Sequence, residues 1–107
     1  MTPEGKIQGE CLAALKLFRD VKVWRNNTGR RGMVSYGLGK GSSDIVGILR
    51  GTGRMFCLEV KVPGKSPSAD QSLWLDTIRE YGGFAAVVTS TSEAIFALKR
   101  AINGDTE

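Results

Sequence analysis

The segment RMFCLEVKVPGKSPSADQSLWLDTIREYGGFAAVVT, residues 54–89, decides the fold. Its start, 54–62, has the alternating pattern of a β-strand, and 84–89 is a short apolar run of strand length. Between them, 68–81 carries apolar residues at helical spacing. A strand, a helix and a second strand in this order form a βαβ unit. We therefore expect the two strands to be parallel and joined by a right-handed crossover.

Capping residues indicate where the helix of this unit begins and ends. Ser68 with Gln71 three positions later matches a capping box. Ser66 followed by Pro67 offers a competing start, because proline is favoured at the first helical position. The glycines at 82–83 predict the end of the helix.

The rest of the chain completes the order α-β-β-β-α-β-α, without an internal repeat. The other expected elements are a first helix at about 6–19, a strand at 21–26, a long glycine-rich loop at 27–44, a strand at 44–50 that forms a hairpin with 54–62, and a last helix that begins near 90. We predict one α/β domain, residues 1–107, with a mixed four-stranded sheet flanked by helices.

Two charged side chains stand in the most hydrophobic strand of this sheet. Because side chains alternate along a strand, Glu59 and Lys61 share one face with Cys57. A tight hairpin places Asp44 opposite this part of the strand: a two-residue loop pairs it with Glu59 or Lys61, and a three-residue loop pairs it with Val60. Two carboxylates and an ammonium group are thus expected at one end of the sheet. The alternative is a cross-strand salt bridge on an exposed face.

The residue types in this group favour one kind of metal chemistry. The chain has no histidine, so the commonest general base and the commonest transition-metal ligand are both absent. Two carboxylates suit Mg²⁺ or Mn²⁺ far better than zinc. Such an ion can bind a scissile phosphate and lower the pKa of a bound water, while a neighbouring lysine stabilises the developing charge.

Positive charge is concentrated in the middle of the chain. The formal net charge is +4 and the isoelectric point is about 9.3. The basic residues between 21 and 54 are Lys22, Arg25, Arg30, Arg31, Lys40, Arg50 and Arg54, against the single acid Asp44. This pattern is compatible with a polyanionic partner and also with a solvated basic face. A non-enzymatic nucleic-acid-binding module, with Trp24 and Tyr36 stacking on bases, is therefore an alternative to an enzyme.

The motif GSSD (41–44), a short hairpin and then LEVK (58–61) resemble the signature of the PD-(D/E)XK nuclease superfamily. The continuation from 60 to 90 resembles its VRR-NUC branch, the virus-type replication-repair nucleases, in the stand-alone form typical of phages. The likeness extends from about Gly9 to Ala101 and implies a restriction-endonuclease-like core. One departure is Ser43, which stands where the superfamily motif nominally has proline.

The resemblance also implies roles for individual residues. It assigns metal binding to Asp44, Glu59, Glu10 of the first helix and the backbone carbonyl of Val60, catalysis to Lys61, and a supporting role near the active site to Gln71. It implies a Mg²⁺-dependent, structure-selective DNA endonuclease, with Mn²⁺ as a possible substitute, that resolves four-way (Holliday) junctions as a homodimer. A nuclease of flap, single-stranded or sequence-specific duplex DNA is the alternative within the same chemistry.

The sequence also leads to expectations about DNA contacts, a dimer interface and the location of the protein in the cell. Phosphate contacts are expected from Arg25, Arg30, Arg31, Lys40 and Lys65, and a dimer interface from Met33, Val34, Tyr36 and Leu38. The chain has no hydrophobic signal region at its start and no apolar run of membrane-spanning length. With Cys11 and Cys57 in apolar surroundings, the sequence predicts a reduced, cytoplasmic protein without membrane contact.

Overall fold

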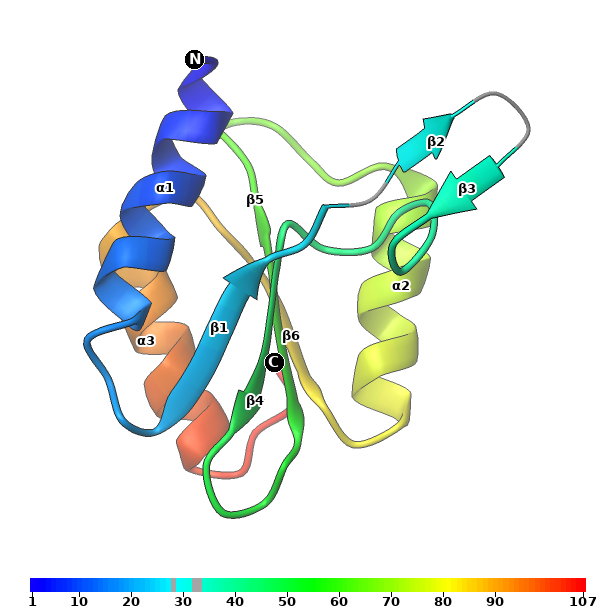
Figure 1. Ribbon diagram of the computed structural model, residues 1–107. Coiled ribbons are helices and arrows are strands. Elements are labelled where there is room, and N and C mark those ends of the chain that lie inside the picture. The colour runs from blue at the N-terminus through cyan, green and yellow to red at the C-terminus, as the bar shows by residue number, and fades with distance from the viewer. Residues whose placement is uncertain (28, 32–33) are drawn as a thin grey trace.

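A four-stranded mixed sheet lies at the centre of the protein (Figure 1), in the strand order β1-β4-β5-β6. The computed structural model describes residues 1–27, 29–31 and 34–107. The elements are α1 (Pro3–Leu15), β1 (Val21–Arg25), β2 (Gly29–Arg31), β3 (Val34–Tyr36), β4 (Ile45–Leu49), β5 (Met55–Val60), α2 (Ala69–Glu80), β6 (Phe84–Val88) and α3 (Thr91–Ile102). The predicted fold class, a mixed sheet flanked by helices, is confirmed.

The βαβ unit has the arrangement that its sequence predicts. Strands β5 and β6 are parallel, with Glu59 level with Val87. Helix α2 begins with a complete capping box: the Gln71 N–H donates to Ser68 Oγ at 3.2 Å, and the Ser68 N–H donates to Gln71 Oε1 at 2.8 Å. The helix therefore starts after Ser68, and the competing start at Ser66 is not used.

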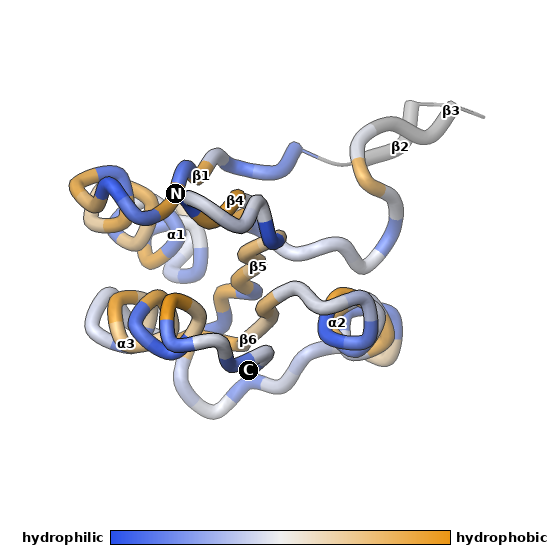
Figure 2. Tube along the Cα trace, turned by 90° about the horizontal axis from the view of Figure 1, so that it is seen from below, coloured by the Kyte–Doolittle hydropathy of each residue, from blue (hydrophilic) through white to orange (hydrophobic). Residues whose placement is uncertain are grey.

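The helices cover the two faces of the sheet unequally. Figure 2 shows α1 and α3 together on one face and α2 alone on the other, alongside β6. The larger core lies under α1 and α3, where the rings of Phe56 and Phe84 stack with centroids 5.4 Å apart. The smaller core lies under α2 and is built from Val46, Cys57, Leu75 and Ala85. The β1 side of this second face is not covered by α2, which packs against β5 and β6.

Three local features differ from the sequence prediction. The segment expected to be a loop at 27–44 contains a small antiparallel ribbon, β2–β3, whose three-residue strands are too short to show a periodic pattern. The turn between β4 and β5 has four residues, 50–53, because the last bond between the two strands runs from the Leu49 N–H to the Arg54 carbonyl, while the Leu49 carbonyl accepts from the Gly53 N–H within the turn. Helix α1 begins at Pro3 rather than near Lys6, since the Thr2 side chain accepts from the Gly5 N–H as its N-cap.

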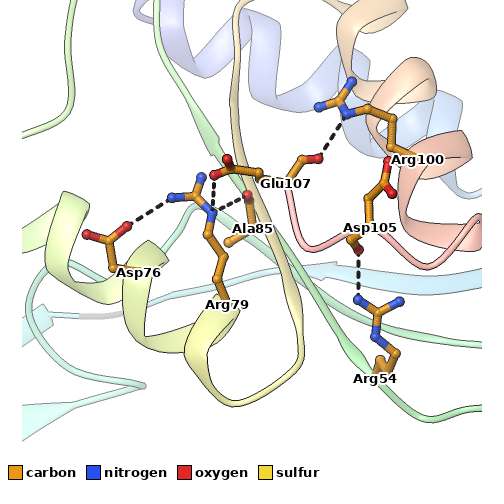
Figure 3. A network of polar contacts seen from close by, with 7 residues as sticks. All are labelled: Arg54, Asp76, Arg79, Ala85, Arg100, Asp105 and Glu107. Carbon is orange, nitrogen blue, oxygen red and sulfur yellow. Dashed lines mark hydrogen bonds and ion pairs between the residues drawn. The ribbon is translucent and has the colours of Figure 1, made fainter.

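Arginine side chains attach the C-terminal segment to the sheet (Figure 3). The Arg54 guanidinium donates to the backbone carbonyls of Gly82, Ala101 and Asp105 at 2.7, 3.1 and 2.8 Å. Arg79 donates to the Ala85 carbonyl and forms ion pairs with Asp76 and Glu107. The Ala85 N–H also donates to the Thr106 carbonyl at 2.9 Å. The edge strand β6 is thereby partly covered by the end of the chain.

Both cysteines are buried and unpaired, as expected. Burial raises the pKa of the Cys57 thiol to about 12. Within the described residues, no helix is long and apolar enough to cross a membrane.

Candidate metal centre

Three carboxylates from three different elements meet at one end of the sheet. Glu4 comes from the first turn of α1, Asp44 directly precedes β4, and Glu59 lies near the end of β5. Each contributes an oxygen atom to a group in which these atoms lie within 4.8 Å of one another. Carboxylate oxygens alone are the donor set of hard cations such as Mg²⁺, Mn²⁺ or Ca²⁺.

The backbone around Asp44 holds its side chain in place. Asp44 Oδ2 accepts from the Val60 N–H at 2.8 Å, and the Asp44 carbonyl accepts from the Asn26 N–H at 2.8 Å. The side-chain amide of Asn26 also donates, from Nδ2, to the Ser43 carbonyl at 2.9 Å. The Ser43 side chain is buried and donates to the Ile45 carbonyl at 3.0 Å. Ser43, which stands where the superfamily motif nominally has proline, therefore uses its hydroxyl group to bond the backbone at the start of β4.

The register of the hairpin decides which residue stands beside Asp44. Ile45 is level with Leu58, and continuing this antiparallel register places Asp44 level with Glu59. The sequence left Glu59, Val60 and Lys61 as alternatives. The four-residue turn selects Glu59, so the two carboxylates share one face of the sheet as direct neighbours.

Glu59 is a buried acid with one oxygen left without a donor. Its side chain is 1 % exposed, and its Oε2 accepts from Gln71 Nε2 at 2.9 Å and lies 3.6 Å from Lys61 Nζ. Its Oε1 is buried and has no hydrogen-bond partner among the described residues. A buried acceptor without a partner is costly. This oxygen therefore favours a proton or a cation at the site.

Burial, reinforced by the negative charge of Asp44, raises the pKa of Glu59 to about 8, although Lys61 opposes the shift. The charged form is disfavoured because a buried carboxylate loses its hydration and faces a second acid. At neutral pH the carboxyl group therefore holds a proton while no cation is bound. Metal binding has to displace that proton, so affinity for a divalent cation is expected to rise as the pH approaches 8.

Lys61 and Gln71 both reach the centre, where the sequence analysis expected them. The Lys61 side chain is only 13 % exposed. The backbone N–H of Lys61 donates to the Val88 carbonyl at 3.0 Å and so extends the pairing of β5 with β6 by one residue. Both polar atoms of the Gln71 side-chain amide are hydrogen-bonded. Oε1 accepts from the Ser68 N–H in the capping box of α2, and Nε2 donates to Glu59 Oε2. The capping box that starts α2 thus also orients a carboxylate of the centre.

The first-helix glutamate in this group is Glu4, and Glu10 is not part of it. Glu10 is exposed on α1, whereas Glu4 lies in the first turn of the helix. Glu4 is thus the first-helix acid that the geometry offers as a ligand, and a role for Glu10 at the metal site stays a prediction. Thr2 followed by Pro3 is the signal that would have identified Glu4, because an N-cap and a proline at N1 start the helix early enough to include it.

The other residues expected at the site are more scattered. The Val60 N–H is bound to Asp44, and a role for its carbonyl as a ligand stays a prediction. Arg25 donates to Gln8 Oε1 at 3.0 Å, Lys40 forms an exposed ion pair with Asp70, and Lys65 is exposed in the loop before α2. The side chains of Arg30, Arg31, Val34 and Tyr36 lie outside the described residues, as does Met33.

Comparisons with known proteins identify the family. A solved structure of a "VRR_NUC domain" superposes with a TM-score of 0.67 over 92 % of this chain and 97 % of the other, at 21 % identity. No match was found among curated proteins. The family model for the VRR-NUC domain matches residues 9–92, which include Asp44, Glu59 and Lys61 but begin after Glu4. With most of its length matched by that model, the chain belongs to the VRR-NUC family, whose members are nucleases of the PD-(D/E)XK type.

Proposed function

We propose that the protein is a Mg²⁺-dependent endonuclease that hydrolyses phosphodiester bonds in DNA. The observation that carries this proposal is the buried Oε1 of Glu59, which has no hydrogen-bond partner among the described residues and lies in a group of three carboxylates. A structural salt bridge with Lys61 does not require the second and third acids. A divalent cation accounts for all three, because it neutralises charges that otherwise repel one another.

The proposed roles follow from the positions of the side chains. Glu4, Asp44 and Glu59 would hold the cation, which when bound lowers the pKa of a water and neutralises the scissile phosphate. Gln71 keeps Glu59 oriented through its 2.9 Å hydrogen bond. Lys61 places an ammonium group beside the same carboxylate, where it orients the nucleophile and stabilises the charge that develops on phosphorus. No histidine is needed for this scheme.

We further propose that the substrate is branched DNA, with four-way junctions the leading case, and that two copies act together. Within the described residues, one group of acids suits a metal ion, and one such centre cuts one strand at a time. Symmetric cleavage of a two-fold junction therefore requires two centres related by a two-fold axis, and a C₂ homodimer supplies them in the simplest way.

One experiment tests the proposed function and its substrate together. Labelled linear duplex, flap, splayed-arm and four-way DNA are incubated with the protein in Mg²⁺ or in EDTA, while light scattering gives the oligomeric state. We expect metal-dependent cleavage, with paired nicks on the four-way junction made by a dimer. Cleavage of flaps by a monomer would overturn the junction proposal alone. If the protein binds DNA but cuts none of these substrates in Mg²⁺ or Mn²⁺, the proposed nuclease function is wrong.

A matched pair of variants tests which glutamate of α1 binds metal. Glu4→Gln removes a ligand charge, so we expect Mg²⁺ or Mn²⁺ affinity to fall about 10- to 100-fold, the range seen even when a partner of a ligand is removed. Glu10→Gln serves as the control because Glu10 is exposed on the same helix. Calorimetric titration measures both. If Glu10→Gln loses metal affinity and Glu4→Gln does not, Glu10 is the metal ligand, as the sequence predicts.

A further inference from the structure

The β1 edge of the sheet carries an exposed tryptophan on the face that Asp44 and Glu59 share. The Trp24 side chain is 42 % exposed, although an indole is among the side chains that gain most from burial. On the next strand Ile48 is 44 % exposed as well. Val46, which is level with Trp24 on β4, is buried under α2 at 4 % exposure. The indole therefore lies at the border between the part of this face that α2 covers and the part that α2 leaves open.

The sheet register places Trp24 next to the carboxylates. Trp24 is level with Val46, and Asp44 lies two residues before Val46, directly before β4. Because the Asn26 N–H donates to the Asp44 carbonyl, the antiparallel pairing continues to this position, and Trp24 and Asp44 are diagonal neighbours in it. Such positions are about 7–8 Å apart, within reach of an aromatic side chain. Since Asp44 belongs to the proposed metal centre, the indole is close to the position of the phosphate that would be cut.

The spacing between Trp24 and Asp44 is held by hydrogen bonds. Asn26 lies two residues after Trp24 and donates its N–H to the Asp44 carbonyl at 2.8 Å. Its side-chain amide donates to Ser42 Oγ at 2.8 Å and to the Ser43 carbonyl at 2.9 Å. These bonds tie the end of β1 to the segment that delivers Asp44. The position of the ring relative to the centre is consequently set in advance of substrate binding.

The charge around Trp24 is suited to a nucleic acid. Lys22 lies two residues before it, exposed and on the same face of β1, and the chain as a whole carries a net charge of +4. Cationic side chains that follow a backbone, combined with an aromatic ring on which a base stacks, are the common means of binding single-stranded nucleic acid. In a duplex the bases are already stacked on one another, so an indole on an open sheet face gains nothing from them.

We propose that Trp24 stacks on an unpaired base of the DNA, next to the phosphate held at the metal centre, so that the enzyme prefers strands with unpaired nucleotides at the cutting site. This inference rests on the proposed nuclease function and adds the local structure of its substrate. It applies directly to single-stranded tails, flaps and splayed arms; in a four-way junction, whose bases are all paired, it requires that a base pair beside the crossover opens. Trp24 is a binding residue in this scheme and has no part in the chemistry.

The test compares binding of unpaired and paired DNA in Ca²⁺ in place of Mg²⁺. Anisotropy is measured with a labelled oligothymidylate and a labelled blunt duplex of matched length. Trp24→Ala should weaken oligothymidylate binding about 10- to 100-fold and leave duplex affinity unchanged, since stacking contributes that much per base. Trp24→Phe should retain most of the affinity. Ile48→Ala, on the same face but farther from Asp44, should bind both DNAs like wild type.

A second measurement does not depend on the alanine variant folding. In a Trp74→Phe background the remaining indole fluorescence comes from Trp24 alone, and oligothymidylate should quench it while duplex should not. An equal loss of affinity for both DNAs in Trp24→Ala, or the absence of quenching, would overturn the inference. Cleavage in Mg²⁺ is scored separately. If the protein cuts DNA but shows neither selective loss of oligothymidylate affinity nor quenching, the nuclease function stands and the stacking inference fails. If it shows both effects but cuts no DNA, Trp24 binds unpaired DNA and the nuclease function fails.

Discussion

Lys61→Met is expected to lower the rate constant of DNA cleavage about 10²- to 10³-fold, the cost of removing one preorganised donor from a site of charge development. The Lys61 ammonium lies 3.6 Å from Glu59 and is largely buried, so solvent does not replace it when it is lost. Methionine keeps an unbranched apolar stem, and the fold should survive. Single-turnover cleavage at saturating DNA and saturating Mg²⁺ measures the effect.

Two controls separate a catalytic role from a structural one. Lys16→Met removes an exposed lysine at the C-terminus of α1 and should cleave at the wild-type rate. Calorimetric Mg²⁺ titration of Lys61→Met reports whether metal affinity changes along with the rate, because Lys61 also acts on the pKa of Glu59. A Lys61→Met protein that binds metal and DNA normally and cuts at the wild-type rate would contradict the assigned mechanism.

Arg54→Met is expected to lower the free energy of unfolding by about 2–4 kcal/mol. The guanidinium donates to three backbone carbonyls, and hydrogen bonds from a charged donor contribute roughly 1.5–3 kcal/mol each, without adding fully. These three carbonyls come from the loop after α2, the end of α3 and the C-terminal segment, and Figure 3 shows the last of them, that of Asp105. A loss of this size lowers the melting temperature of a small domain by roughly 10–20 °C.

Arg50→Met is the matched control for this variant, because Arg50 lies in the same hairpin and is exposed. Its free energy of unfolding should change by no more than about 0.5 kcal/mol, as is typical of surface substitutions. Denaturant unfolding followed by circular dichroism measures both proteins. If Arg54→Met and Arg50→Met unfold at the same denaturant concentration, the three carbonyl bonds do not hold the C-terminal segment to the sheet.

Local periodicity in the sequence was sufficient to predict the βαβ unit and the charged face of its first strand. Glu59 and Lys61 share a face because side chains alternate along any strand, whatever surrounds it. The capping residues Ser68 and Gln71 likewise act within four positions of the chain. Predictions of this kind depend on neighbours in sequence, and the structure contains each of these features.

The tertiary structure alone decided which residues from distant segments meet. The N-cap at Thr2 shows that α1 includes Glu4, but only the packing of α1 on the sheet decides that Glu4, and not the exposed Glu10, lies beside Asp44 and Glu59. The length of the hairpin turn decided that Asp44 stands beside Glu59. The exposure of Trp24 likewise depends on α2 covering only part of its face. Periodicity determines which face of an element is apolar, but long-range packing between elements determines what that face meets.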